Sequence, residues 1–371
     1  MRDKNTDICY NIFMKINLSK EDLKKLDYLL QIKEQNMSIA ELYFSTFDQP
    51  TYFNEKNVIR LMKKNDCSET EAILSLILSY SKIDRNSIEN KKIINSIIRP
   101  SIKELNIDKY LKNPYYNSIK LSNIEQKGVE IENLSFEPYE LIPIGEITVD
   151  YPNGYLERTN IGYFKSPLPY LAISKNKTIW MSITPSEIDS MEKEIKEAKG
   201  KVITFGLGLG YYAYMVSLKN DVESVTIVDN DDDIIDLFLT YILPQFEFKN
   251  KIHVVKSDAF KFLTNSLQEY DYAYFDLWHS PTDGLMMYLK IKPYEKKNPH
   301  TKFAYWLNES IEAMYRRCKL TLLEEQLNQF DEQCYIESSC ETDTIINTLY
   351  EQTKNTFINT YEDVLDFLNN N

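Results

Sequence analysis

The stretch Lys201–Asp229, KVITFGLGLGYYAYMVSLKNDVESVTIVD, decides how the rest of the chain is interpreted. A short apolar run leads into glycines at positions 206, 208 and 210, a segment with helical spacing follows, and a second apolar run ends in Asp229. This order of strand, glycine turn, helix, strand and acid predicts half of a nucleotide-binding βαβ unit. Glycines suit such a turn because a Cβ would obstruct a backbone that approaches a ligand closely. The acid can accept hydrogen bonds from both hydroxyls of a ribose.

The spacing of the glycines separates two kinds of ligand. A dinucleotide fingerprint reads G-x-G-x-x-G and requires glycine at position 211, where this chain has Tyr211. The pattern G-x-G-x-G resembles that of class I S-adenosylmethionine (SAM) dependent methyltransferases. A tight strand-to-helix turn that binds no ligand is the alternative, and a dinucleotide oxidoreductase is a more distant one.

Charge and composition narrow the class of partner. The 371 residues carry a net charge of −13, which argues against a nucleic-acid substrate because such a substrate requires a basic face. Residues 1–140 hold equal numbers of acidic and basic side chains, so the whole excess lies in residues 141–371. An acidic field there would attract a cationic substrate, and a solvated acidic surface would explain the same excess.

The cysteines and the hydropathy pattern bear on location. Five cysteines are scattered without a C-x-x-C pair, so neither a zinc site nor a disulfide framework is expected. The N-terminus lacks a signal-peptide pattern, and no apolar run approaches the roughly 20 residues that a membrane span requires. We therefore expect a cytoplasmic protein that holds no metal and does not enter a membrane.

Residues 1–135 predict a helical N-terminal domain with no catalytic constellation. Polar residues that commonly cap helices precede apolar stripes with helical spacing at Ser19, Ser38, Asn54, Ser68 and Ser87. Prolines and glycines between positions 134 and 155 mark a boundary. We expect a linker and β-hairpin region at 136–183, followed at 184–371 by a Rossmann-like SAM-binding catalytic domain with a helical C-terminal extension.

The β-hairpin and the helix after it are predicted from local signals. Strand-like runs at 171–174 and 178–183 flank the polar turn Lys175-Asn176-Lys177. Thr184 then provides an N-cap, with Pro185 at the first helical position and Glu187 at the third. This helix is expected to end near position 198, just before the strand that leads to the glycine turn.

The order of hairpin, helix and glycine-turn strand resembles spermidine synthase and its relatives within the class I methyltransferase superfamily. The resemblance covers roughly residues 154–283. It implies an α/β fold with a Rossmann-like, doubly wound and mainly parallel sheet, preceded here by the β-hairpin and an all-α N-terminal domain. Many methyltransferases carry an acid two residues before the first glycine, where this chain has Thr204. That departure fits the spermidine-synthase-like branch better than the generic family.

Two further strands predict the rest of the cofactor site. A third strand ends at Asp258-Ala259, and a fourth, Tyr270–Phe275, leads into Asp276. The resemblance implies that Asp258 accepts a hydrogen bond from the adenine amine and that the Ala259 N–H meets a ring nitrogen. Ligands bind at the carboxyl ends of such strands. The residues expected to bind SAM are Gly206, Leu207, Gly208, Gly210, Asp229, Asn230, Asp258, Ala259 and Asp276.

The loop that follows the fourth strand, DLWHSPTDG at 276–284, is the candidate for the chemistry. Aminopropyltransferases read D-x-x-D-P here; this chain keeps the first acid as Asp276 and has His279 in place of the second. Both are candidate catalytic residues, since an imidazole titrates near neutral pH. A purely local role for His279 is an equal alternative. Leu277, Trp278 and Tyr211 are candidate substrate-binding residues, although packing alone would also explain Trp278.

Beyond Gly284 the family pattern weakens. Residues 302–307 predict a fifth strand, 309–330 a long helix, and 343–368 a further helical segment that is a candidate homodimer contact. The family's usual sixth and seventh strands are not apparent, so either the sheet is shorter than the family norm or other elements replace these strands.

The interpretation is a SAM-dependent methyltransferase with a small-molecule acceptor that the sequence does not identify. One alternative is an aminopropyltransferase that uses decarboxylated SAM. Another is a module that binds SAM or a nucleoside without catalysis.

Overall fold

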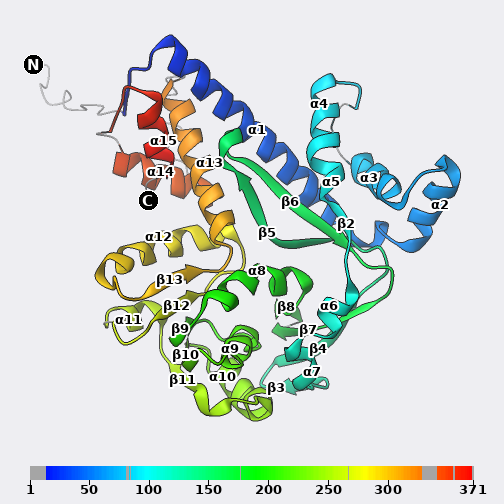
Figure 1. Ribbon diagram of the computed structural model, residues 1–371, viewed down its shortest axis with the longest axis vertical. Helices are drawn as coiled ribbons and strands as arrows, with labels where there is room; N and C mark the ends of the chain where they lie inside the picture. The colour runs from blue at the N-terminus through cyan, green and yellow to red at the C-terminus, as the bar shows by residue number, and fades with distance from the viewer. Residues whose placement is uncertain are drawn as a thin grey trace, which may run out of the picture.

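A five-stranded parallel sheet forms the centre of the C-terminal half (Figure 1). The computed structural model describes residues 14–80, 83, 85–175, 177–265, 267–327, 341–353 and 356–369. The strand order is β11-β10-β9-β12-β13, and every neighbouring pair is parallel. The strands are β9 (Gly200–Phe205), β10 (Val222–Asp229), β11 (Ile252–Lys256), β12 (Tyr272–Phe275) and β13 (Lys302–Tyr305).

The strands that follow β9 in the chain lie on both sides of it in the sheet. The chain moves outward through β10 to β11 and then returns to the other side of β9 to form β12 and β13. Such a reversal leaves a crevice at the carboxyl ends of the two strands where the direction changes, here β9 and β12. The expected Rossmann-like, doubly wound parallel sheet is confirmed, including the fifth strand, and the described residues add no further strand to this sheet.

Alternation along the strands places helices on both faces of this sheet. On β12, Tyr272 and Tyr274 belong to one apolar cluster, whereas Ala273 and Phe275 belong to another. The first cluster includes α8 (Pro185–Glu197), α9 (Tyr211–Ser217) and α10 (Asp232–Leu237). The second includes α11 (Ala259–Leu263), α12 (Pro281–Lys297) and α13 (Asn308–Leu327).

Two further sheets precede the parallel sheet along the chain, one antiparallel and one mixed. The predicted hairpin is confirmed as β7 (Leu168–Lys175) and β8 (Thr178–Ser182), but it is half of a four-stranded sheet, β3-β4-β7-β8. The expected linker is also structured, because β5 pairs with β6 in a sheet of order β2-β6-β5. The bounds are β2 (Ile102–Glu104), β3 (Ile124–Gln126), β4 (Val129–Phe136), β5 (Ile142–Asp150) and β6 (Leu156–Tyr163).

The N-terminal region is helical, as expected, over most of its length. Caps at Ser19, Asn54 and Ser87 are confirmed by hydrogen bonds to their side chains, whereas Ser38 lies inside one continuous helix. The helices end at Ser118, earlier than the expected 135. They are α1 (Lys20–Phe47), α2 (Glu55–Asn65), α3 (Glu69–Tyr80), α4 (Ile88–Ile93), α5 (Arg99–Ser101), α6 (Ile107–Leu111) and α7 (Pro114–Ser118).

The early end of the helical region has a physical reason. Buried Val129 and Ile131 alternate with more exposed Glu130 and Glu132, which is the two-residue period of a half-buried strand. Residues 124–136 therefore form β3 and β4 and extend the sheet that contains the hairpin.

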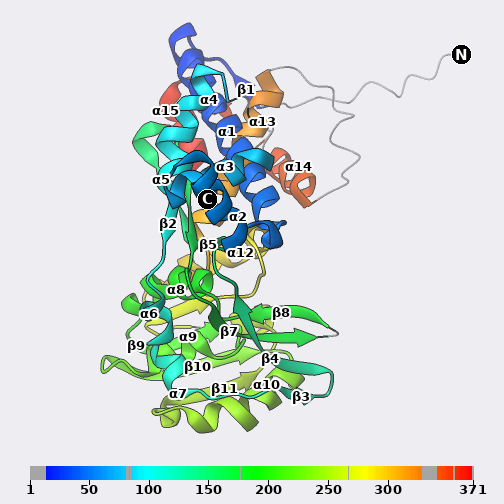
Figure 2. The ribbon, with the colours of Figure 1, turned by 90° about the vertical axis from the view of Figure 1, so that its right-hand side faces the viewer.

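The C-terminal extension returns to the N-terminal helices. The predicted helix at 309–330 is confirmed as α13 up to Leu327, and positions 328–330 lie outside the described residues. α13 packs beside α1, and Lys33 on α1 forms an ion pair with Glu324 (Figures 1 and 2). The last elements are α14 (Glu341–Thr353), β14 (Phe357–Ile358) and α15 (Tyr361–Asn369); β14 pairs in parallel with β1 (Lys15–Ile16). Within the described part of the chain, no helix combines the length and the apolar character needed to cross a membrane.

Candidate active site

A cavity of about 490 Å³ lies at the carboxyl ends of β9, β10, β11 and β12. Phe205 pairs with Val228 on one side and with Phe275 on the other, so the three strands end in register. This register places Gly206 between Asp229 and Asp276 at one edge of the sheet. The volume is within the range of cavities that hold a nucleoside-sized ligand.

The glycine turn forms the floor of the cavity. Gly206 has a φ of 102°, and a Cβ there would overlap the carbonyl oxygen of Asp276. Gly208 has a φ of 55°, and the nearest neighbour of a Cβ at this position is the Met181 sulfur, 3.0 Å away. The turn therefore needs residues without side chains, both for its backbone conformation and for the approach of a ligand between it and β8.

Gly210, also predicted to bind the cofactor, is placed differently from Gly206 and Gly208. It is not among the residues that line the cavity. It has a φ of 72°, begins α9, and packs so closely on Phe238 that a side chain would overlap the ring. Gly210 is therefore required by the start of the helix. The other predicted cofactor residues line the cavity: Gly206, Leu207, Gly208, Asp229, Asn230, Asp258, Ala259 and Asp276.

Asp229 is held in place by backbone donors. Its two carboxylate oxygens accept hydrogen bonds from the N–H groups of Leu207, at 2.9 Å, and Asp231, at 2.8 Å. Burial raises the pKa of Asp229 above its usual value. A carboxylate has about four acceptor sites, so two bonds leave capacity for ribose hydroxyls.

Asp258 and Ala259 lie at the next strand end. The Asp258 side chain caps α11 by accepting a 2.8 Å hydrogen bond from the Lys261 N–H. This contact orients the carboxylate at the edge of the cavity, and Ala259 follows it at the start of the helix. The position agrees with the adenine role that the resemblance implies.

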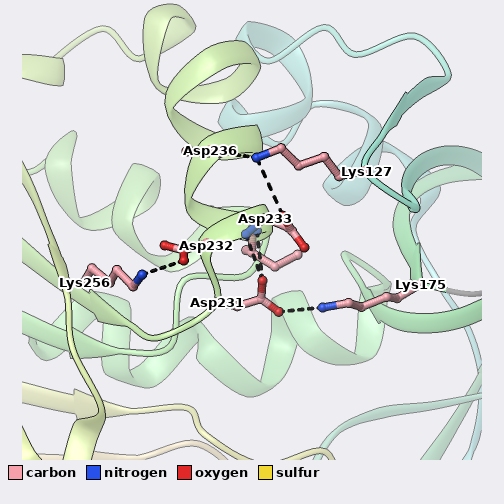
Figure 3. Close-up of polar contacts among 8 residues, drawn as sticks. Lys127, Lys175, Asp231, Asp232, Asp233, Asp236 and Lys256 are labelled. Atoms are coloured by element: carbon pink, nitrogen blue, oxygen red, sulfur yellow. Dashed lines mark hydrogen bonds and ion pairs between the residues drawn. The ribbon is translucent and has the colours of Figure 1, made fainter.

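Three lysines from different elements pair with acidic residues of α10 and its N-cap, Asp231 (Figure 3). Lys175 on β7 lies 2.8 Å from Asp231, and Lys256 on β11 lies 2.5 Å from Asp232. Lys127, from the turn between β3 and β4, lies 2.8 Å from Asp236. The Lys175–Asp231 pair connects the hairpin directly to the loop that carries Asp229.

Two acidic side chains, Asp276 and Glu187, line the cavity, and both are half-buried. Burial raises the pKa of Asp276 to about 7. Burial and the neighbouring charge of Asp276 raise the pKa of Glu187 on α8 to about 8. Glu187 also accepts a 3.4 Å hydrogen bond from the Ser182 hydroxyl. Among the described residues that line the cavity, none is a lysine or an arginine that could neutralise this pair.

Sequence reasoning placed Glu187 only as a residue of the helix cap. That role is confirmed, because Thr184 caps α8 and accepts a hydrogen bond from the Glu187 N–H. The first turn of α8 nevertheless brings the Glu187 side chain to the cavity. The one sequence signal for this placement was that Glu187 follows the hairpin directly, because α8 must then pack next to the glycine turn. Other lining residues that the sequence did not indicate are Trp180, Met181, Ser182, Met191, Tyr212, Met287 and Trp306.

The predicted substrate-binding residues line the cavity but are partly committed to packing. Trp278 is buried, and its indole N–H donates to the carbonyl oxygen of Trp306 at 3.1 Å. Tyr211 is buried, and its hydroxyl accepts a hydrogen bond from the Asn113 amide at 3.0 Å. Leu277 also lines the cavity. Trp278 and Tyr211 therefore form fixed walls.

His279 lies at the rim of the cavity. Its side chain is 58% exposed, and its Nδ1 lies 3.5 Å from Asp283, which also accepts a hydrogen bond from the His279 N–H. The imidazole makes an edge-to-face contact with Trp180 on β8, with ring centroids 4.8 Å apart. Asp276 is thus the half-buried member of the predicted catalytic pair and His279 the exposed one.

Comparison with protein families gives the type of this domain. The family model described as the spermine/spermidine synthase domain matches residues 184–287, which run from the start of α8 into α12 and include the glycine turn and all four strand ends. Residues 184–287 form a spermidine-synthase-like domain. This match supports a transferase and agrees with the expected class I methyltransferase-like fold. It covers less than a third of the chain.

Solved structures with similar folds are distant. Spermidine synthase from Thermotoga maritima is 13% identical, with a TM-score of 0.28, over 41% of this chain and 58% of that one. A Klebsiella pneumoniae protein provisionally assigned as an O-methyltransferase is 11% identical, with a TM-score of 0.26, over 43% and 62%. The chain thus spans less than two thirds of the length of either structure. No curated protein matches the chain in sequence.

Proposed function

We propose that the protein transfers a methyl group from SAM to an amine acceptor. The observation that carries this proposal is the Glu187–Asp276 pair, two half-buried carboxyl groups that line a nucleoside-sized cavity and whose pKa values are both raised. Two acids in one apolar site repel each other when both are ionised, and a bound cation relieves that repulsion. An amine acceptor is a ligand of that charge.

The donor is expected at the other end of the cavity. Asp229 and Asp258, at the ends of β10 and β11, provide acceptors for a ribose and an adenine amine. The turn at Gly206 and Gly208 leaves space for the tail that carries the sulfonium. This order along the cavity directs the sulfonium toward Asp276.

The transfer step needs positioning and a proton acceptor. The bound ammonium first gives one proton to a carboxylate of the pair; the freed lone pair then forms the N–C bond, the C–S bond breaks, and the C–S electron pair stays on sulfur as a neutral thioether. Asp276 is the group best placed to take the proton that the nitrogen loses, because burial already brings its pKa to about 7. Glu187 holds the acceptor against the donor, and this orientation accounts for much of the expected rate enhancement.

Aminopropyl transfer from decarboxylated SAM is the second candidate, and a specific observation favours it. Among the described lining residues there is no lysine or arginine to pair with the carboxylate of SAM, which the decarboxylated donor lacks. Against it, His279 replaces the second acid of the D-x-x-D-P pattern. Glu187 supplies a carboxylate from another element.

Calorimetry and mass spectrometry separate these functions. Titrations with SAM, decarboxylated SAM, S-adenosylhomocysteine and NAD identify the donor class, and we expect binding of the first three. Turnover of SAM with a panel of amines should yield methylated amine. Abundant spermidine from decarboxylated SAM and putrescine would replace methyl transfer with the second candidate. Binding without turnover of either donor would indicate a sensor module.

A further inference from the structure

Trp180 occupies an unusual position on the edge strand β8. In the pairing of β7 with β8, Ile173 lies opposite Met181 and Ser174 opposite Ile179, so Trp180 is an extra residue with no partner on β7. Such a β-bulge redirects a side chain and is often found beside a functional site. Trp180 lines the cavity, whereas its neighbour Ile179 does not. Both side chains are largely exposed, at 43% and 52%.

The contacts of Trp180 place it across the mouth of the cavity. Its ring makes the edge-to-face contact with His279, at 4.8 Å and 84°, which joins β8 to the loop after β12. The next residue, Met181, lies over Gly208. Lys175, which pairs with Asp231, has its Nζ 6.0 Å from the Trp180 ring centroid. The hairpin thus spans the cavity from the ribose side to the acceptor side.

An exposed tryptophan beside an acidic cavity can contact a cationic ligand through its ring face. Its ring face attracts ammonium groups more strongly than any other side-chain ring does. The carboxyl pair of Glu187 and Asp276 lies deeper in the same cavity. A cation that enters past Trp180 therefore meets first an aromatic face and then two acids.

We propose that Trp180 determines acceptor specificity, because its ring and the His279 imidazole form the wall against which a cationic amine rests while Glu187 and Asp276 hold its inner end. This inference rests on the proposed amine acceptor, and it adds the residue that selects extended or bulky amines. Aliphatic replacement removes the ring face and leaves the donor end of the cavity unchanged.

The test measures amine binding to the full chain with the donor site filled. Wild type, Trp180→Leu, Trp180→Phe and the control Ile179→Ala are saturated with S-adenosylhomocysteine and titrated by calorimetry with putrescine, agmatine and histamine. For the amine that binds wild type best, we expect Trp180→Leu to weaken affinity by about 2- to 30-fold. Trp180→Phe should recover part of that loss, and Ile179→Ala should match wild type. The affinity for S-adenosylhomocysteine should stay within about twofold in all four proteins.

Each other outcome has a distinct meaning. If none of the three amines binds wild type, the amine acceptor is wrong and this inference is overturned with it. If wild type binds an amine and Trp180→Leu binds it equally well, the role of Trp180 alone is overturned. Loss of S-adenosylhomocysteine affinity in Trp180→Leu would assign the ring to the donor and would also overturn it. An equal loss in Trp180→Phe and Trp180→Leu would show that the ring face is not what the acceptor contacts.

Discussion

The backbone N–H of Leu207 donates a 2.9 Å hydrogen bond to the side chain of Asp229, which joins the glycine turn after β9 to the acid at the end of β10. Asp229 also accepts a bond from the Asp231 N–H, and Asp231 in turn pairs with Lys175 of the hairpin. Three segments that bound the cavity are thus connected through two carboxylates, those of Asp229 and Asp231.

Replacing Asp229 should weaken donor binding sharply. In Asp229→Ala the ribose hydroxyls lose a charged acceptor, for which roughly 1.5–3 kcal/mol, or about 10- to 150-fold in affinity, is expected. Calorimetry with SAM measures the loss. Asp232→Ala is the matched control, because Asp232 is exposed on the same loop and pairs only with Lys256 among the ion pairs described. Unchanged affinity in a folded Asp229→Ala protein would remove Asp229 from the site.

A side chain at Gly208 should abolish donor binding. Valine there must adopt a φ of 55° and would occupy the space between the turn and Met181. Gly128→Val is the control, because Gly128 also has a positive φ, 79°, but has open space around it. Both variants should lose some stability, and only Gly208→Val should lose SAM binding in calorimetry. Normal SAM binding by Gly208→Val would mean that the glycine serves the turn alone.

The sequence alone predicted those features for which the local residue pattern and the sheet topology agree. Alternating apolar runs that end in Gly206, Asp229, Asp258 and Asp276 predict parallel strands whose carboxyl ends meet, and the structure brings these residues to one cavity. The N-caps at Thr184 and Asn54 were also readable, because capping depends on residues within one turn.

Features that depend on contacts distant in sequence were not predictable. Glu187 has the local pattern of a capping residue, and only the packing of α8 against β12 brings it next to Asp276. Trp180 reaches the cavity because of a β-bulge in β8, and the composition of this segment does not indicate a bulge. The strands β3, β4 and β5 were assigned to helix and linker, and for β4 one partner, β7, lies farther along the chain.

Breaking the Lys175–Asp231 pair should have a small effect on the donor. The pair is partly exposed, so its contribution is about 0.2–1 kcal/mol, and Lys175→Met should weaken SAM binding by about 1.5- to 5-fold. The difference from wild type should shrink as salt is added. Lys127→Met, which breaks a pair farther along α10, should leave SAM affinity unchanged. Equal effects of the two variants in calorimetry would argue against a link through Asp231.

The Glu187–Asp276 pair should make the protein without ligands less stable at alkaline pH. Burial raises the folded-state pKa of both groups above their unfolded values, so the folded state binds more protons between about pH 4 and pH 8. Stability is therefore greatest below this window and falls as pH rises through it. Glu187→Gln should raise the Tm by a few degrees at pH 8.5, on the order of 1 kcal/mol, and much less at pH 4. A pH-independent change in calorimetric scans would contradict this assignment.

The same pair should release protons when an amine binds. A bound ammonium favours the ionised carboxylates and lowers both pKa values from about 7 and about 8. At pH 7 about one proton should then leave the protein for each amine bound, and amine affinity should increase between pH 6 and pH 8.5. Titration of the protein saturated with S-adenosylhomocysteine, in buffers of different ionisation enthalpy, counts these protons. Glu187→Gln should release fewer, whereas Glu192→Gln, an exposed position on the same helix, should behave as wild type. Amine binding without proton release in wild type would place the cation elsewhere in the cavity.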